Sequence, residues 1–148
     1  MVVCQAAIQR IVDGDTLDVV ARVWPGQTAS ERVRLTCRGQ TAVDAWEKRG
    51  AERPLGEVAT AFVRQELTGC EWVLLVVGDE RDNFGRLLAG VLYLPRCDDL
   101  WTILNDGIDL GARLIDKGYA TPYVRDVVDV VDGPIQPVPA GWKEMRNA

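Results

Sequence analysis

Hydrophobic and polar residues alternate along the first part of the chain, the pattern of strands with one buried face. Residues 2–12 and 15–24 alternate in this way on either side of an Asp13-Gly14 pair, and residues 31–35 resume the alternation. A period of two places successive side chains on opposite faces of a sheet, and an Asp-Gly pair between two such runs is a strong hairpin signal. This part of the chain is therefore predicted to form a β-hairpin followed by a third strand.

The apolar spacing changes to a helical one after residue 51. Leu55, Val58, Phe62 and neighbouring apolar residues recur every three to four positions, which predicts a helix over residues 51–67. The remaining predicted elements are strands at 71–77 and 86–94, joined by a polar turn, and a short helix at 109–118 with Asp109 as its N-cap and Gly118 as its end.

Five strands, with one helix after the third and another near the end, fit a small closed barrel. The predicted fold class is α+β, mainly β: a five-stranded OB-fold Greek-key barrel with two to three helices. We assign residues 1–124 to this domain and residues 125–148 to a C-terminal extension or tail, where prolines and glycines follow pairs of valines. The chain has no apolar run of membrane-spanning length and no signal-peptide pattern, so we expect a cytoplasmic protein, or a secreted one if the sequence is a trimmed form.

The chain contains no histidine, and its four cysteines never form a CxxC pair. A zinc site is therefore not expected, and Ser-His-Asp and Cys-His catalysis are excluded. Acid–base chemistry would have to use carboxylates, lysine, tyrosine or metal-bound water. We expect buried free thiols in an intracellular chain, and one or two disulfides remain an alternative if the protein is exported.

The net charge of −5 is concentrated near the C-terminus. Residues 97–133 carry three basic against eight acidic side chains, whereas residues 1–96 are nearly balanced. Without a basic field over the whole chain, tight non-specific binding of nucleic acid is not indicated. The acidic segment could dock a basic protein partner, or it could be an ordinary solvated helix and tail.

Two clusters of carboxylates stand where chemistry could occur. Asp13 and Asp15 are two apart beside the predicted hairpin turn, which gives them the same direction; the alternative is that Asp13 and Gly14 simply make a turn. Asp44 and Glu47 are three apart and could open onto one cleft, or could be an acidic pair that favours the dipole of the following helix. Arg86, taken alone, reads as a solvated charge at the edge of a strand.

Five motifs taken together resemble the staphylococcal nuclease (thermonuclease) family. They occur in the family's order across residues 6–123, and the family fold is also an OB-fold barrel with helices. Each motif is weak alone, so the signal is their order and spacing. The motifs are Val12-Asp13-Gly14-Asp15-Thr16, Arg32-Val33-Arg34-Leu35, Val43-Asp44-Ala45-Trp46-Glu47, Asp82-Asn83-Phe84-Gly85-Arg86-Leu87-Leu88-Ala89 and Leu114-Ile115-Asp116-Lys117-Gly118-Tyr119-Ala120.

The resemblance implies a calcium-dependent nuclease that hydrolyses phosphodiester bonds of DNA and RNA with little sequence specificity. Calcium prefers oxygen ligands in loose geometry, such as carboxylates, carbonyls and water. The alternative is a catalytically silent OB-fold module that binds single-stranded nucleic acid or a protein. The implied roles are metal ligands for Asp15 and Asp44, with the Ala45 carbonyl; catalysis for Arg34, Glu47 and Arg86; and substrate stacking, or else packing, for Phe84 and Tyr123.

The match departs from the family at three places. The step from Arg34 to Asp44 is ten residues where the family usually has five, so Arg38 is a rival for the first phosphate-binding arginine. Trp46 replaces a proline, which leaves that segment less constrained, and Asn83 replaces a lysine. Together with the acidic net charge, these changes predict weaker substrate binding and greater salt sensitivity.

Overall fold

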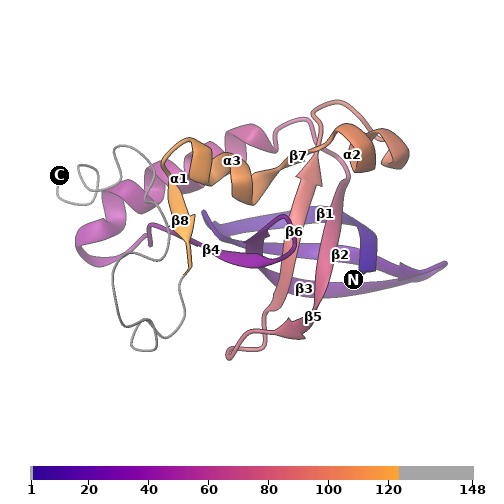
Figure 1. Cartoon of the computed structure of the whole chain (residues 1–148), viewed down its shortest axis with the longest axis horizontal. Helices are drawn as coiled ribbons and strands as arrows, with labels where there is room; N and C mark the ends of the chain where they lie inside the picture. The colour runs from indigo at the N-terminus through magenta and orange to yellow at the C-terminus, as the bar shows by residue number, and fades with distance from the viewer. Residues whose placement is uncertain (1, 124–148) are drawn as a thin grey trace.

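A closed β-barrel is the centre of the structure, a computed structural model that describes residues 2–123 (Figure 1). The predicted tail at 125–148 lies outside the described residues. The strands form one sheet in the order β7-β6-β5-β1-β2-β3-β4-β8, and β6 also pairs with β3, which closes the barrel. The strand bounds are β1 (Val2–Asp13), β2 (Thr16–Trp24), β3 (Gln27–Cys37), β4 (Thr41–Ala45), β5 (Val73–Arg81), β6 (Leu87–Tyr93), β7 (Ile108–Asp109) and β8 (Ala120–Pro122).

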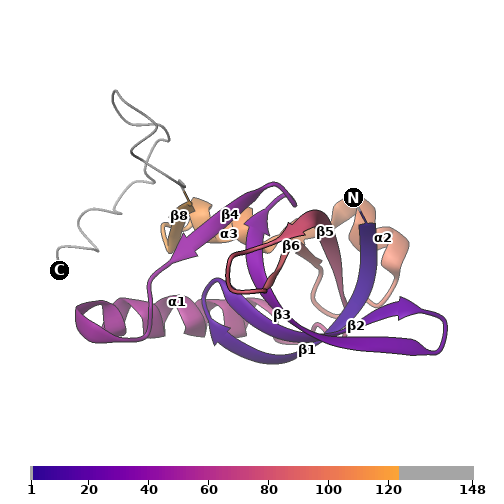
Figure 2. The ribbon, with the colours of Figure 1, turned by 90° about the horizontal axis from the view of Figure 1, so that it is seen from below.

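The closed part of the sheet is the predicted five-stranded OB-fold barrel, built from β1, β2, β3, β6 and β5. All of its neighbouring strands are antiparallel except β3 and β6, which pair in parallel with Arg34 opposite Leu88. Side chains of β2 alternate between the barrel interior and its outer surface. Leu17 and Val19 point inward and are fully buried, whereas Arg22 is on the other face and is exposed. The hairpin of β2 and β3 projects beyond the barrel (Figure 2).

Helices cover one side of the barrel (Figure 1). Within residues 2–123 they are the 3-10 turn η1 (Gly50–Glu52), α1 (Arg53–Glu66), α2 (Leu100–Asp106) and α3 (Leu110–Asp116). The predicted N-cap of α3 is confirmed, because the Asp109 carboxylate accepts a 2.9 Å hydrogen bond from the Ala112 amide. No helix of the described residues is long and apolar enough to cross a membrane.

Helix α2 was not predicted from the sequence. It is only seven residues long and buries just one of its side chains, Ile103. A helix this short does not repeat its apolar positions often enough for a period to be recognised. The three further short strands β4, β7 and β8 escaped prediction for the same reason.

The barrel interior is joined to the helices by a partly buried polar cluster of Tyr93, Glu66 and Arg113. Tyr93 on β6 is 1% exposed, and its hydroxyl donates a 2.9 Å hydrogen bond to the Glu66 carboxylate at the end of α1. Arg113 on α3 donates to the same carboxylate oxygen at 2.9 Å. Two hydrogen-bond donors offset the loss of hydration of the Glu66 carboxylate. Because the donors come from β6 and α3, their bonds hold α1 and α3 against the barrel.

Candidate active site

One cleft of about 810 Å³ opens at the end of the barrel where the β1–β2 turn, β4 and the β5–β6 turn meet. Its size falls within the roughly 300–1,000 Å³ typical of ligand sites. The lining includes every side chain that the sequence analysis selected for the site: Asp15, Arg34, Asp44, Glu47, Phe84, Arg86 and Tyr123. These residues come from distant parts of the chain, and the barrel brings them together.

Asp15 is the most buried acid of the cleft, at 9% exposure. It follows the tight turn at Gly14, where a Cβ would lie 3.0 Å from Ala45 Cβ, so the turn packs directly against β4. The Asp15 carboxylate accepts hydrogen bonds from the Thr16 hydroxyl at 2.9 Å and from the Ala45 amide at 3.0 Å. These donors compensate for burial of the carboxylate and fix its orientation.

Arg34 links Asp15 to Asp44. Its Nη2 atom lies 3.8 Å from Asp15 Oδ2 and 3.8 Å from Asp44 Oδ1, so the two carboxylates are no further apart than twice that distance. Its Nε and Nη2 atoms also donate to the Val43 carbonyl at 3.1 and 2.8 Å. The guanidinium, 14% exposed, thus holds a positive charge between two acids at the floor of the cleft.

The rival arginine, Arg38, lies outside this cleft. The extra residues between β3 and β4 form a tight hairpin turn in which Arg38 and Gly39 both have positive φ angles, of 56° and 75°. The turn is anchored away from the cleft, because the Arg38 amide donates a 2.8 Å hydrogen bond to the Asp109 carboxylate and Gly39 packs against Val76. The insertion therefore lengthens a hairpin and leaves Arg34 as the cleft arginine.

Arg86 is oriented by Asp82 within the β5–β6 turn. The Asp82 carboxylate accepts from the backbone amides of Phe84 and Arg86 at 2.9 and 2.8 Å, and from Arg86 Nε at 2.5 Å. Burial tends to raise the pKa of Asp82, but these hydrogen bonds outweigh it and hold that pKa below its usual value. Arg86 also donates to Thr16 Oγ1 at 3.4 Å. At 22% exposure, its side chain is not the solvated edge charge of the alternative interpretation.

Glu47 stands at the mouth of the cleft in an ion pair with Arg49. Arg49 Nε donates to Glu47 Oε2 at 2.6 Å, and this bond lowers the pKa of Glu47. The backbone of Glu47 is fixed by α1, because a Cβ at Gly56 would collide with the Glu47 carbonyl. Neither Asp44 nor Glu47 lies in the first turn of α1, which begins at Arg53, so the helix-dipole interpretation of this pair is wrong.

Trp46 anchors the segment that carries Glu47. Its side chain is fully buried beside Ala59 of α1, with Leu55 and Tyr119 packed around them. The expectation that Trp46 leaves this segment less constrained is therefore not met, since packing of a large side chain replaces the rigidity of a proline ring.

Two aromatic rings border the cleft next to the arginines. The Cζ atom of Arg34 lies 5.5 Å from the centre of the Tyr123 ring, and that of Arg86 lies 5.5 Å from the Phe84 ring. Phe84 is 84% exposed and Tyr123 is 47% exposed. Core packing is thereby excluded for Phe84, and both rings have a face directed to a guanidinium in a cation–π contact.

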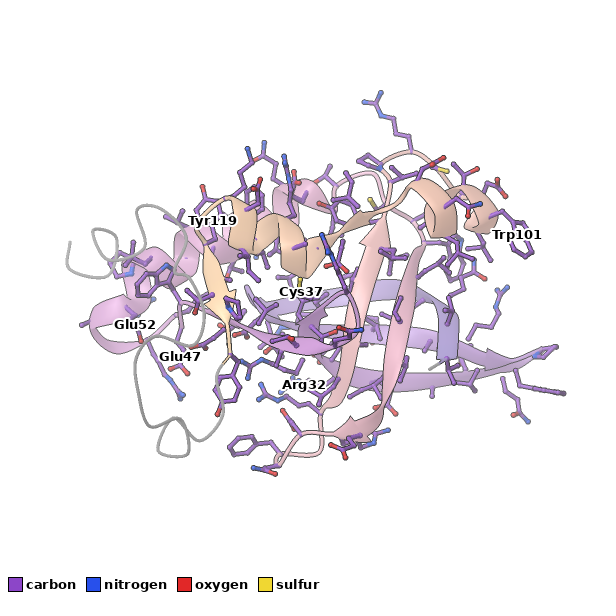
Figure 3. All side chains as sticks on the ribbon, viewed as in Figure 1. Arg32, Cys37, Glu47, Glu52, Trp101 and Tyr119 are labelled. Atoms are coloured by element: carbon purple, nitrogen blue, oxygen red, sulfur yellow. The ribbon has the colours of Figure 1, made fainter. Side chains whose placement is uncertain are left out.

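Sequence reasoning selected the reactive groups but missed those that hold and surround them. Asp13 was paired with Asp15 as a candidate, with a simple turn as the alternative, but was given no role. It lines the cleft, where burial and the nearby Asp15 charge raise its pKa. Asp82 orients Arg86. The sequence Asp-Asn-Phe-Gly is typical of an Asx turn and could have indicated that Asp82 accepts hydrogen bonds within this turn. The cations missed by the sequence analysis are Arg10, Arg32, Lys48 and Arg49. Figure 3 shows Arg32 and Glu47 on the side of the barrel away from α2 and Trp101.

The oxygen donors at the floor of the cleft are of the type that calcium prefers. The Nη2 atom of Arg34 lies between the Asp15 and Asp44 carboxylates. The Ala45 amide donates a hydrogen bond to the Asp15 carboxylate. Among the described residues there is no group of three or more acids or cysteines arranged around a metal position. Asp15 and Asp44 are the carboxylates at this point of the cleft that could hold a divalent ion.

The four cysteines are free thiols, as predicted, but they are only partly buried where full burial was expected. Burial raises the pKa of Cys4, Cys37 and Cys70, which makes these thiols less nucleophilic at neutral pH. They contribute nothing to the chemistry of the cleft.

Comparison of the chain with protein-family models finds no match, and comparison with curated protein sequences finds none either. The class of protein is therefore defined by its fold and cleft alone: an OB-fold barrel with a charged, aromatic-bordered cleft at one end.

Proposed function

We propose that this chain is a metal-dependent nuclease of the staphylococcal nuclease type, acting on phosphodiester bonds of DNA or RNA with little sequence specificity. One observation carries the proposal: the three carboxylates and two guanidiniums selected from the sequence come from four separate segments and line a single cleft, together with further charged side chains. Acids gathered in this way repel one another unless cations stand between them, as Arg34 does here. The arrangement suits a ligand that brings both a divalent cation and an anionic phosphate.

Arg34 and Arg86 are the groups to bind the phosphate. A guanidinium is a planar fork that can donate to two phosphate oxygens, and it remains charged at any working pH. During attack on phosphorus, negative charge grows on the equatorial oxygens. Fixed cations directed there stabilise the transition state more than the ground state. Asp82 supports this role by fixing the Arg86 side chain before substrate arrives.

Glu47 is the group to receive a proton from the attacking water. Without histidine, a carboxylate is the available base, and the low pKa of Glu47 keeps it ionised. Asp15 and Asp44 would hold Ca²⁺, which when bound supplies a positive charge that orients water and offsets charge on the phosphate. Asp15 is already oriented for this by its bonds to Thr16 and Ala45.

Phe84 and Tyr123 account for the expected lack of sequence specificity. Every base has a π face, so stacking on an exposed ring does not depend on which base is present. Binding at the exposed rings would favour single strands, because paired bases are already stacked inside a duplex. The substrate class proposed is therefore single-stranded DNA or RNA.

The test is digestion of single-stranded DNA by the full chain with calcium, with magnesium and with a chelator. We expect cleavage in calcium that the chelator abolishes, and a loss of at least about 100-fold in Glu47→Gln or Arg86→Ala. Asp106→Asn, an exposed change on α2, is the matched control. Full activity of either cleft variant would overturn the role given to that residue.

A silent binding module is the second candidate function. It is favoured by the internal pairing of the cleft, where Arg34 already donates to Val43 and Glu47 already binds Arg49. Groups satisfied by their own chain must exchange partners before they can act on a substrate. Binding of single-stranded DNA without cleavage in any divalent cation would favour this module over the nuclease.

A further inference from the structure

Arginines occupy the outer face of the barrel next to the cleft. Cross-strand pairing places Arg10, Asp18 and Arg32 opposite one another on β1, β2 and β3. Because side chains alternate along a strand, these three face away from the buried Leu17 and Val19. Arg10 and Arg32 also line the cleft, so this row begins at its edge.

The same face continues away from the cleft with small residues and then another arginine. Ala7, Val20 and Ser30 form the next row across the three strands. Two positions further along β2 stands Arg22, whose guanidinium lies 5.3 Å from the centre of the Trp72 ring. The row of Ala7, Val20 and Ser30 thus separates the arginines at the cleft edge from Arg22, and none of its three side chains is long or charged.

The charge of this face is opposite to that of the whole chain. Three guanidiniums, those of Arg10, Arg22 and Arg32, stand against two carboxylates, in a protein of net charge −5. These carboxylates are Asp18, within the row, and Asp13, at the cleft edge near Arg32. Asp18 accepts bonds of 2.8 and 3.1 Å from Arg32, which lower the pKa of Asp18. Arg32 is still half exposed. Local positive charge kept on an acidic protein indicates an anionic ligand.

We propose that Arg10, Arg32 and Arg22, with Trp72, form a strip that binds the backbone of a single-stranded nucleic acid where it leaves the cleft. This subsite rests on the proposed function, because its ligand is the continuation of the strand held there. Asp18 and Arg22 are four residues apart on β2, roughly 13 Å, so the strip reaches beyond the nucleotides that the cleft holds.

Aromatic side chains beside the cations favour a single strand over a duplex. The Arg22 guanidinium lies over the Trp72 ring. Trp24, the last residue of β2 before the turn to β3, is 68% exposed. Bases can stack on such rings only when they are unpaired. OB-fold proteins commonly bind about 4–16 nucleotides of single-stranded nucleic acid in cationic grooves that also carry aromatic rings.

The experiment compares two fluorescein-labelled oligothymidylates, of about four and about twelve nucleotides. Their dissociation constants are measured by anisotropy in calcium chloride, on the full chain carrying Glu47→Gln so that the probes remain intact. We expect the longer probe to bind about tenfold more tightly. Adding Arg22→Glu should weaken binding of the longer probe until the two dissociation constants are nearly equal. Arg22→Gln should weaken binding of the longer probe by a smaller factor.

Arg64→Glu is the matched control, because it makes the same change of net charge at an exposed position on α1. For the longer probe, the slope of log Kd against log salt should fall by about 0.7–1.4 in Arg22→Glu and keep its value in Arg64→Glu. Equal affinities for the two probes in the parent chain, or equal losses in both charge reversals, would overturn the strip and leave the nuclease proposal standing. Absence of binding to either probe, with no cleavage by the unmodified chain, would overturn both.

Discussion

The Glu47 carboxylate accepts a 2.6 Å hydrogen bond from the guanidinium of Arg49, two residues further along the chain. Both side chains are at least half exposed, at 51% and 81%, so the pair stands in contact with solvent at the cleft mouth. Exposed pairs contribute little to stability. The consequence of this pair is electrostatic: it keeps Glu47 ionised in more acidic solution than an ordinary glutamate.

Arg49→Gln should move the pH dependence of cleavage. Without its main hydrogen-bond donor, the pKa of Glu47 rises toward the ordinary value of 4.5, so protonation removes the base at a higher pH. The acidic limb of kcat/KM for single-stranded DNA is expected to shift upward in pH. Arg53→Gln, which breaks the similar 3.0 Å pair with Glu57 on α1, is the control that should leave the limb in place. An unmoved limb in Arg49→Gln would remove Glu47 from the role of base.

Asp82→Asn should lower activity although residue 82 need not touch substrate. The asparagine oxygen can still accept from the two backbone amides, but the charged bond to Arg86 Nε is lost. A guanidinium displaced by about 1 Å can cost about 100-fold in rate. Initial rates are compared with those of Asp106→Asn, and melting temperatures of both variants show that the fold is retained. Wild-type rates in Asp82→Asn would mean that Arg86 needs no such support.

Arg34→Gln and Arg38→Gly should differ sharply. Arg34 carries the charge between Asp15 and Asp44, so its loss is expected to reduce cleavage by at least about 100-fold and to destabilise the fold by about 1–3 kcal/mol. Arg38 lies at the hairpin tip with a φ of 56°, a conformation that glycine adopts more easily. Cleavage rates and urea denaturation of both variants test this, and a larger loss in Arg38→Gly would reverse the assignment.

Tyr93→Phe should change stability in a way that depends on pH. Burial and the bond to Glu66 raise the pKa of Tyr93 above 10.0, so the folded state keeps the neutral phenol. The stabilisation is fully present below pH 10 and declines as pH rises, because the unfolded chain ionises there while the folded one does not. At neutral pH the variant should be less stable by about 1.5–3 kcal/mol, the range for a hydrogen bond to a charged group.

Thermal melts of the two proteins should therefore converge as the pH rises past 10.0. A constant difference in melting temperature across that range would show that ionisation of Tyr93 does not contribute. The phenylalanine variant keeps the ring that fills the barrel, so the comparison isolates the hydroxyl.

The barrel and the candidate residues of the cleft could be predicted because their signals are local and periodic. Short-range residue patterns predict the hairpin around Asp13 and Gly14 and the helix that ends before Gly69. The candidate residues of the cleft lie next to elements of this kind. The order of the motifs, through the family resemblance, then selected seven residues that the structure places in one cleft. The sequence left Arg34 and Arg38 as alternatives, because no local pattern says which way an inserted hairpin will point.

What could not be predicted depends on contacts between distant residues. In the sequence, Arg49 is one of several charged residues in a polar segment, and no local pattern indicates its 2.6 Å hydrogen bond to Glu47. The row of Arg10, Asp18 and Arg32 exists only because of strand register, with a bulge in β1 between Ile8 and Arg10 that sets the alignment. Helix α2 lacked a recognisable period because it buries a single residue.

The parallel pairing of β3 with β6 has a consequence for how the protein matures. Arg34 and Arg86 reach the same cleft only after these strands, far apart in the chain, have joined. A contact between segments so far apart in sequence is intrinsically slower to form than a hairpin, because a long loop must be closed. A newly made or partly unfolded chain without this pairing would hold Arg34 and Arg86 apart. Under the proposed function, affinity for an oligonucleotide would therefore report that β3 and β6 have paired.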